Sequence, residues 1–168
     1  MARGAAPFDS PSSGNTTGVG PIVCCVDDSD GARAALRSAH ALAEALGLEL
    51  VLLHVEPTAN LPGISAAPGA HQRLLAEEAR DAEALLERLA GEGGLDGARR
   101  RVEFGRAADG ILAVCEQEDA ELVVLGSHGR RGVRAAVLGS VSAEVAAKAP
   151  CACLIVPPAA AARPFLAA

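Results

Sequence analysis

Short runs of apolar residues alternate with longer amphipathic stretches along most of this chain. Continuous apolar runs of this length are typical of strands that are buried on both faces of a sheet. Four runs have that character, and a fifth, at residues 100–104, is polar enough to lie at a sheet edge, where charged residues discourage further pairing. The predicted strands are residues 22–26, 48–55, 100–104, 121–125 and 151–156.

Between these strands, apolar residues recur every three or four positions, as they do along a helix that buries one face. The first such stretch has Ser29 as a candidate N-cap and stops at Gly47, which suits a left-handed C-cap. Pro150 closes the last stretch, because proline cannot continue a helix. The predicted helices are residues 30–46, 75–89, 107–117 and 141–148. This alternation predicts an α/β fold: an open, doubly wound five-stranded parallel sheet with helices on both faces, Rossmann-like.

The two ends of the chain lack this periodicity. We expect residues 1–20, rich in Gly, Ser, Thr and Pro, to form a disordered leader, and residues 158–168 to form a loose C-terminal tail. Residues 21–157 then make one domain, in keeping with a length of 168 residues. The leader has no apolar h-region, and no run reaches the roughly 18 apolar residues of a membrane span. We therefore expect a cytoplasmic protein with no membrane partner.

Composition narrows the classes of partner further. The formal net charge is −6, opposite in sign to the surfaces that bind nucleic acid. The chain has three Phe, no Trp and no Tyr, so it lacks the aromatic platforms on which single-stranded bases stack. Beside the glycine loop, positive charge is clustered only at Arg130, Arg131 and Arg134. We expect no nucleic-acid partner.

The positions of the five cysteines favour buried core thiols. Four of them lie inside predicted strands, and one falls on the apolar face of a predicted helix. A pair two residues apart in the last strand shares one side of that strand, which is a poor geometry for a zinc knuckle. A redox or metal role is the alternative; the prediction is that there is no metal site. The cysteines are Cys24, Cys25, Cys115, Cys151 and Cys153.

Glycine and serine flank the segment between the fourth predicted strand and the last predicted helix. Gly126-Ser127-His128-Gly129 follows the strand directly, and nine residues later Gly139-Ser140-Val141-Ser142 leads into the helix. Glycines let the backbone approach a phosphate closely, while the amides and the dipole of a helix N-terminus favour negative charge. The serine hydroxyls add donors at the same place. The spacing therefore predicts a nucleotide phosphate site; the alternative is a tight glycine connection with capping serines.

Asp27 is the candidate for the other side of this site. It follows the first predicted strand as Gly126 follows the fourth, and doubly wound sheets bind ligands beyond the carboxyl ends of their strands. If these strands are neighbours, Asp27 faces the glycine loop and can bond a ribose or a base; alternatively it caps the next helix. Of the four histidines only His128 lies in the loop, where it contacts phosphate or points to solvent. No nucleophile stands beside a base, so the sequence indicates at most slow ATP hydrolysis and no catalytic residue.

Several of these motifs together resemble the universal stress protein family. They are the first strand ending in Asp27, the segment Leu53-His54-Val55, the glycine loop and the triplet Ala149-Pro150-Cys151. The resemblance covers about residues 20–157. It implies the strand order 3-2-1-4-5, which places the first strand beside the fourth. The complete glycine set resembles the ATP-binding branch, and so implies ATP, or else ADP or AMP, with Mg or Mn as a candidate accompanying ion.

By this resemblance, Asp27 and Val55 would border the adenosine, and Cys25 and Leu125 would supply apolar walls. The predicted phosphate loop consists of Gly126, Ser127, His128, Gly129, Gly139, Ser140, Val141 and Ser142. The last strand is apolar on both faces and lies at an edge in the family's order. It would therefore pair with its own copy in a homodimer. The alternative is that the Ala- and Pro-rich tail covers that edge.

Three functions remain open at this point. The first is an adenine-nucleotide-binding regulatory module of the stress response, which is not an enzyme and acts on a protein client that the sequence does not name. The second is an adenylating or nucleotide-transferring enzyme of the related α/β group, for which Arg130, Arg131 and Arg134 are the only catalytic candidates. The third is a dimerisation module whose pocket is empty. We predict the first.

Overall fold

The computed structural model describes residues 18–57, 70–95, 97–129 and 138–157. Most of the predicted leader, the connection after the second strand, the three clustered arginines and the C-terminal tail lie outside the described residues. In chain order the elements are β1 (Ile22–Cys25), α1 (Asp30–Leu46), β2 (Leu50–Glu56), α2 (Ala70–Gly93), β3 (Arg99–Phe104), α3 (Ala107–Gln117), β4 (Leu122–Gly126), α4 (Ser140–Lys148) and β5 (Ala152–Val156).

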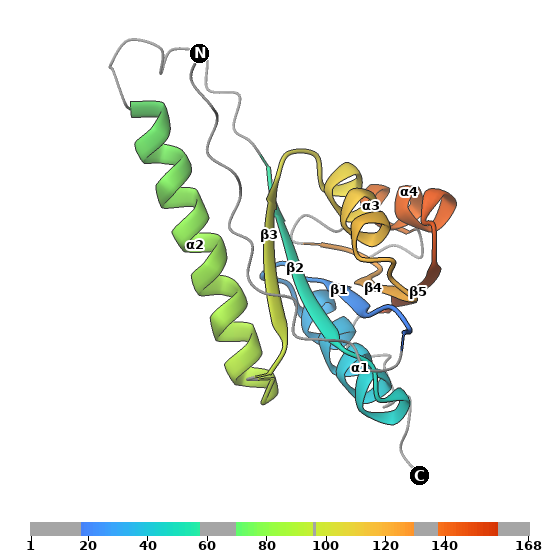
Figure 1. The fold of residues 1–168 in the computed structure, drawn as a ribbon. Helices are drawn as coiled ribbons and strands as arrows, with labels where there is room; N and C mark the ends of the chain where they lie inside the picture. Colours follow the sequence, from blue (N-terminus) through green and yellow to red (C-terminus); the bar gives the residue numbers. More distant parts are fainter. Residues whose placement is uncertain (1–17, 58–69, 96, 130–137, 158–168) are drawn as a thin grey trace.

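The five strands form one parallel sheet in the order β3-β2-β1-β4-β5. This confirms the predicted fold class and strand order, with β1 at the centre (Figure 1). The chain runs outward from β1 to β3 on one side and from β4 to β5 on the other. The switch point, at which ligands bind in such sheets, therefore lies between β1 and β4.

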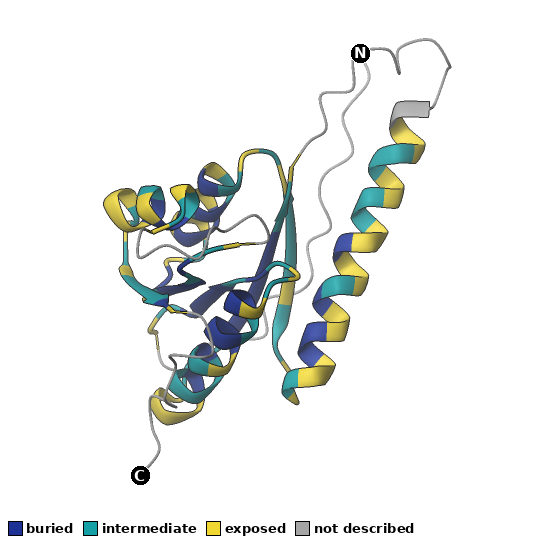
Figure 2. Ribbon diagram, turned by 180° about the vertical axis from the view of Figure 1, so that it is seen from behind, coloured by how far each residue is buried: buried dark blue, intermediate teal, exposed yellow. Residues whose placement is uncertain are grey.

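Each strand alternates its side chains between two helical layers. Ile22 and Cys24 of β1 pack with α1 and α2, whereas Val23 packs with α3 and α4. Figure 2 shows the central strands buried and the outer faces of the helices exposed. Fully burying a valine, leucine or isoleucine contributes roughly 1.5–3 kcal/mol, so these two apolar layers stabilise the packing of the helices on the sheet. None of the described helices is both long and apolar enough to cross a membrane.

The helix boundaries follow the capping residues closely. Ser29 caps α1 by accepting a hydrogen bond from the amide of Ala32, and Gly47 ends α1 in the left-handed conformation, with φ 65°. α3 occupies the predicted residues, and the strands differ from their predicted ends by one or two positions. α2 is longer than the predicted 75–89, because polar residues before Leu75 continue the helix without adding an apolar signal.

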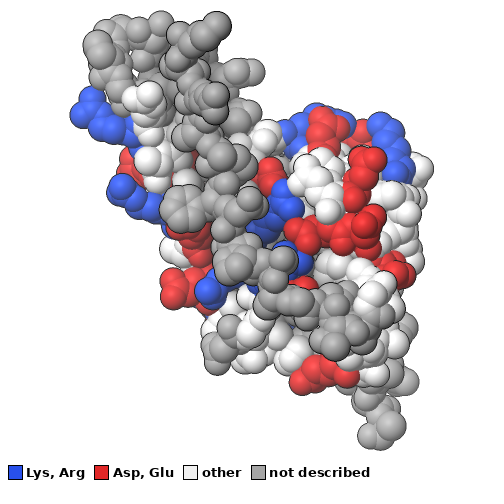
Figure 3. All heavy atoms as spheres, in the orientation of Figure 1, with Lys and Arg blue, Asp and Glu red and all other residues white. Residues whose placement is uncertain are grey.

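The polar strand β3 lies at a sheet edge, as predicted. Arg99 bonds Glu49 at 2.5 Å and Glu118 at 2.6 Å, and Arg101 bonds Glu118 at 2.9 Å. Hydrogen bonds from Arg99 hold the pKa of Glu118 below its usual range, with a smaller contribution from Arg101. Acidic and basic side chains accordingly lie intermixed on this face of the molecule (Figure 3).

Candidate functional site

The residues that follow β1 and β4 meet at the predicted switch point. The two strands pair in parallel with Cys25 opposite Leu125, so the segments that follow them leave the sheet side by side, at the carboxyl ends of the strands. A Cβ atom built on Gly129 would lie 2.7 Å from Oδ2 of Asp27, closer than real Cβ contacts come. The carboxylate therefore occupies the space that a side chain at position 129 would need. Asp27 faces the glycine loop, in the arrangement that the sequence predicts.

Ser29 fixes the carboxylate from the other side. Its hydroxyl donates to Oδ1 of Asp27 at 2.5 Å and accepts the amide of Ala32 at 3.1 Å. Ser29 itself is the N-cap of α1, with extended backbone angles. The alternative interpretation, in which Asp27 caps this helix, therefore does not describe the observed cap.

The two ends of the glycine loop are joined by hydrogen bonds. The carbonyl of Ser127 accepts the amide of Gly139 at 2.8 Å. The hydroxyl of Ser142 donates to the carbonyl of Gly126 at 2.8 Å and to that of Ser127 at 3.3 Å. Residues 130–137 between these ends lie outside the described residues. Because its proton is engaged by loop carbonyls, Ser142 positions the loop in this structure; its direct contact with a phosphate stays a prediction.

The first turn of α4 supplies backbone donors at this position. The first hydrogen bond within the helix runs from the amide of Ala143 to the carbonyl of Gly139, at 2.9 Å. The amides of Ser140, Val141 and Ser142 precede that bond and have no acceptor within the helix. Ser140 is exposed at the helix start. Together with the helix dipole, these three amides can bind an anionic group such as a phosphate.

Ser127 and His128 lie between the strand and the loop. Ser127 is buried, and its hydroxyl is 3.1 Å from Nδ1 of the half-buried His128. The ring is thus held against its neighbour rather than extended into solvent. A contact between His128 and a phosphate remains a prediction.

The two predicted wall residues and Val55, predicted to border the adenosine, share one face of the sheet. Cys25, Val55 and Leu125 all pack on the side of α3 and α4, the layer in which α4 begins. Val55 lies directly against α3, since a Cβ atom on Gly110 would be 3.0 Å from its Cγ1 atom. Leu125 is buried, while Cys25 and Val55 are half-buried. An apolar wall therefore lies next to the polar loop on the same side of the sheet.

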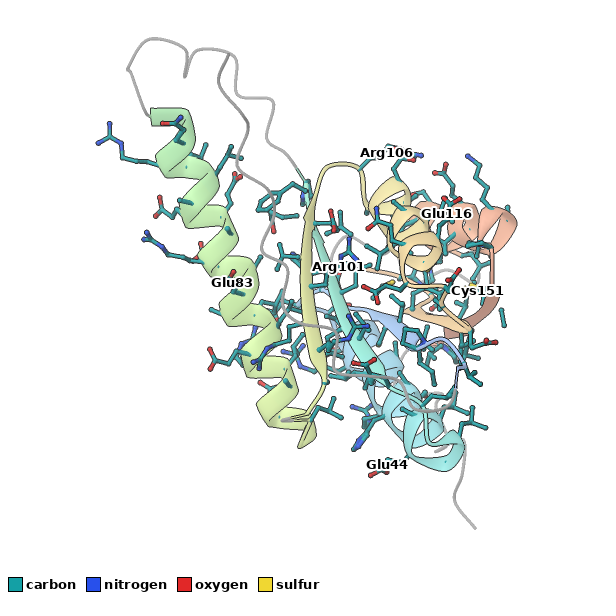
Figure 4. All side chains as sticks on the ribbon, viewed as in Figure 1. Glu44, Glu83, Arg101, Arg106, Glu116 and Cys151 are labelled. Atoms are coloured by element: carbon teal, nitrogen blue, oxygen red, sulfur yellow. The ribbon has the colours of Figure 1, made fainter. Side chains whose placement is uncertain are left out.

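An exposed ion-pair cluster connects α4 to α3. Arg106 at the start of α3 bonds Glu144 of α4 at 2.6 and 2.7 Å and Asp109 at 2.6 and 2.7 Å. Figure 4 labels Arg106 at this end of α3. Hydrogen bonds from Arg106, and then from Lys148, lower the pKa of Glu144 to about 2. Arg106 and Lys148 are thus both paired with carboxylates. Among the described residues at the start of α4, the positive character comes mainly from backbone amides.

One glycine at this site was not predicted from the sequence. Gly31, in the first turn of α1, lies so near the loop that a Cβ atom there would be 2.8 Å from the carbonyl oxygen of His128. A Cβ atom on Gly126 would in turn lie 2.8 Å from the carbonyl carbon of Gly31. The sequence signal that could have identified Gly31 is its place in an alanine-rich first turn, where alanine has the better helix propensity. Gly31 therefore lets the loop rest on α1.

All five cysteines are free thiols, and burial controls their chemistry. Cys24 and Cys115 are buried, as predicted for core thiols, and desolvation raises the pKa of each to about 12. The other three cysteines are half-buried. Among the described residues, no group of three or more His, Cys, Asp or Glu side chains is arranged to hold a metal ion.

Alkylation kinetics should reflect this burial. A pKa raised from 9.0 to about 12 lowers the thiolate fraction about a thousandfold at a given pH, and the thiolate is the nucleophile. We expect Cys24 and Cys115 to react with iodoacetamide at pH 8 more than about a hundredfold slower in native than in denatured protein. Peptide mapping by mass spectrometry measures each site, with the denatured chain as control. Labelling of both cysteines in native protein at the denatured rate would contradict the expectation.

Comparison with known proteins identifies relatives of this fold and sequence. The model of the Universal stress protein family matches residues 18–157. A universal stress protein of Thermus aquaticus is 36% identical over 141 residues, covering 80% of this chain and 96% of that protein. Universal stress protein UspA from Lactobacillus plantarum superposes with a TM-score of 0.69 at 24% identity, over 82% of this chain and 97% of that one. A universal stress protein from Archaeoglobus fulgidus in complex with dAMP gives a TM-score of 0.56 at 25% identity, over 81% and 96%.

Proposed function

This chain belongs to the universal stress protein family, and on that premise we propose that it binds an adenine nucleotide and acts in the cytoplasm as a regulatory module of the stress response. The observation that carries the proposal is the contact of Asp27 with Gly129 at the β1–β4 switch point, next to the first turn of α4. An acceptor for a ribose and a set of donors for phosphates thus lie side by side. The dAMP complex of the Archaeoglobus fulgidus relative supports adenine as the base.

The proposed pose follows from the chemistry of each part. Asp27 accepts a hydrogen bond from the ribose, and the apolar wall of Val55 and Leu125 packs against the base. The phosphates lie at the amides of Ser140 and Val141, which have no acceptor within the helix. ATP is the proposed ligand, with ADP and AMP as alternatives. An accompanying Mg²⁺ or Mn²⁺ would be bound chiefly by phosphate oxygens and water, as is usual for such ions.

We assign the nucleotide a regulatory role and not a catalytic one. Bound ATP would favour one conformation or dimer surface, by no more than its difference in affinity between the two states, and a protein client would recognise that surface. An adenylating enzyme would need a nucleophilic substrate and catalytic groups beside the phosphates. The described residues around the loop supply backbone donors, serine hydroxyls, one histidine and the Asp27 carboxylate, a set that suits binding.

Native mass spectrometry of freshly purified protein, followed by calorimetry, tests the proposed function. We expect an adenine nucleotide to be retained or to bind when added, with ATP, ADP, AMP and cyclic AMP titrated separately to rank them. An adenylated product in the spectrum would favour the enzyme alternative. Empty protein that gives no heat with any of the four nucleotides would favour the dimerisation module and overturn the proposal.

We also propose that two copies pair through β5. This strand is the outermost on its side of the sheet, and Cys153, Leu154 and Ile155 are only half-buried within one chain. An edge strand of this kind has free backbone groups that a second copy can satisfy about a two-fold axis. Val156, in contrast, is buried in its own core and does not contribute to the exposed edge.

Replacing Leu154 with lysine should yield monomers, because a two-fold interface would remove one charged lysine of each copy from water. Sedimentation velocity at tens of micromolar, well above a dissociation constant on the order of 1 μM, measures the effect. Leu46→Lys is the matched control, since Leu46 is 60% exposed at the end of α1 and should leave the dimer intact. Wild-type protein that sediments as a monomer at this concentration would refute the dimer.

A further inference from the structure

A buried histidine connects the ends of β1 and β2 below the proposed nucleotide site. His54 is only 4% exposed, and it alternates with Val55, so its ring lies on the opposite face of the sheet from the apolar wall. Nδ1 of the ring is 2.8 Å from the carbonyl oxygen of Val26, and Nε2 is 3.0 Å from Oε2 of Glu56. Both ring nitrogens therefore have a partner at hydrogen-bond distance.

The first of these contacts has only one possible direction. A backbone carbonyl oxygen can accept a hydrogen bond but cannot donate one, so Nδ1 carries the proton and donates to Val26. That carbonyl belongs to the peptide joining Val26 to Asp27. Because the peptide is planar, fixing its oxygen also fixes the orientation of the amide at Asp27. The amide of Val26 bonds the carbonyl of Leu53 at 2.9 Å, so both sides of this residue are tied to β2.

The second contact holds the ring in place. Glu56 is anchored in turn, because its backbone carbonyl accepts the amide of Gly105 at 2.9 Å. An ionised carboxylate can only accept, so Nε2 also carries a proton when it bonds Glu56, and the two N–H groups of the ring donate in opposite directions. The bond to Glu56 therefore holds the ring with Nδ1 pointing at Val26. Continuous contacts thus run from Glu56 through His54 to the backbone at Asp27, whose carboxylate meets Gly129.

We propose that His54 is a positioning residue for the nucleotide site: its Nδ1–H group clamps the Val26–Asp27 peptide and so directs the Asp27 carboxylate toward the glycine loop. This inference rests on the proposed function. Two supports then act on the same acidic residue. Ser29 holds the side chain through Oδ1, and His54 holds the backbone through the carbonyl of the preceding residue. The competing interpretation is that the histidine only fills space between β2 and the α1–α2 layer.

Two substitutions separate these interpretations. In His54→Asn the amide nitrogen can stand near the position of Nδ1 and keep the donor to Val26. In His54→Gln the amide reaches toward the position of Nε2, which keeps a donor to Glu56 but removes the one to Val26. Both variants lose the ring, so their cost in packing is similar. They form a matched pair that differs mainly in the proposed clamp.

Calorimetric titration with ATP gives the first readout. We expect His54→Asn to bind within about threefold of wild type and His54→Gln to bind about tenfold more weakly, as the loss of one buried hydrogen bond predicts. Equal affinities for the two folded variants would overturn the clamp. If wild-type protein binds no nucleotide, the proposed function fails as well, whereas binding by wild type with equal variants overturns only the inference about His54.

The NMR carbonyl shift of Val26 in nucleotide-free protein gives a second readout. It should stay near the wild-type value in His54→Asn and move in His54→Gln, whereas a space-filling role would move neither or both alike. If neither His54 variant folds, Glu56→Gln and Glu56→Leu replace them. Glutamine keeps an acceptor for Nε2 and should bind ATP as wild type does, while leucine removes it and should weaken binding. Equal ATP affinity of these two variants would also overturn the proposal.

Discussion

Gly139→Val is expected to lower the affinity for ATP by at least about a hundredfold while the protein remains folded, a loss of about 2.7 kcal/mol in binding free energy. The reason is space and not backbone conformation. Gly139 has φ −61° and ψ 155°, which any residue can adopt. A Cβ atom there already lies 3.1 Å from the carbonyl oxygen of Ser127. The two further methyl groups of valine would occupy the approach to the first amides of α4, where the phosphates are proposed to lie.

Ala143→Val is the matched control for this variant. Ala143 lies on the exposed side of α4, so valine there adds a β-branched side chain near the loop without entering it. Calorimetry with ATP and thermal melting should be run on both variants. Reduced affinity only in Gly139→Val supports the phosphate assignment. A folded Gly139→Val protein with wild-type affinity would remove this loop from the site.

The sequence was sufficient to predict the helices and strands of the α/β fold because their signals are local, while the strand order came from the family resemblance. A parallel sheet buries its strands on both faces, so the strands appear as short continuous apolar runs, as at Ile22–Cys25. Capping residues fixed the ends of α1, because the Ser29 hydroxyl accepts the amide of Ala32 and Gly47 adopts the left-handed conformation that few other residues prefer. The ends of α2 could not be predicted in this way. Polar helix-forming residues extend it to Ala70, and neither an apolar period nor a cap marks that boundary.

The candidate site was predictable only in part. The glycine spacing and the position of Asp27 after β1 indicated the candidate site residues. That β1 and β4 are neighbours came from the family resemblance. Contacts between distant segments left no local pattern. His54 bonds a carbonyl 28 positions away, and Gly31 meets the loop through its missing side chain. The bonds from the Ser142 hydroxyl to the loop carbonyls were likewise not predicted, and its contact with a phosphate stays a prediction.

Gly126→Ala should produce the largest loss of stability among single-methyl additions at the described glycines of the loop. Gly126 ends β4 where the strand passes the first turn of α1. An added Cβ atom would lie 2.8 Å from the carbonyl carbon of Gly31 and 3.0 Å from its oxygen. These are backbone atoms, which cannot rotate away as a flexible side chain would, so α1 and β4 would have to separate. Overpacking of this kind typically costs about 1–3 kcal/mol.

Gly91→Ala adds the same methyl group where nothing opposes it, and is the control. Gly91 is exposed in α2, and no atom lies within 4 Å of a Cβ atom built there. Alanine should therefore stabilise the helix by about 0.5–1 kcal/mol. At about 2–4 °C per kcal/mol, thermal melting should fall by roughly 2–12 °C in Gly126→Ala and rise by a few degrees in Gly91→Ala. A Gly126→Ala protein that melts at or above the wild-type temperature would show that α1 and β4 tolerate a side chain between them, and the close contact that supports the loop would have to be revised.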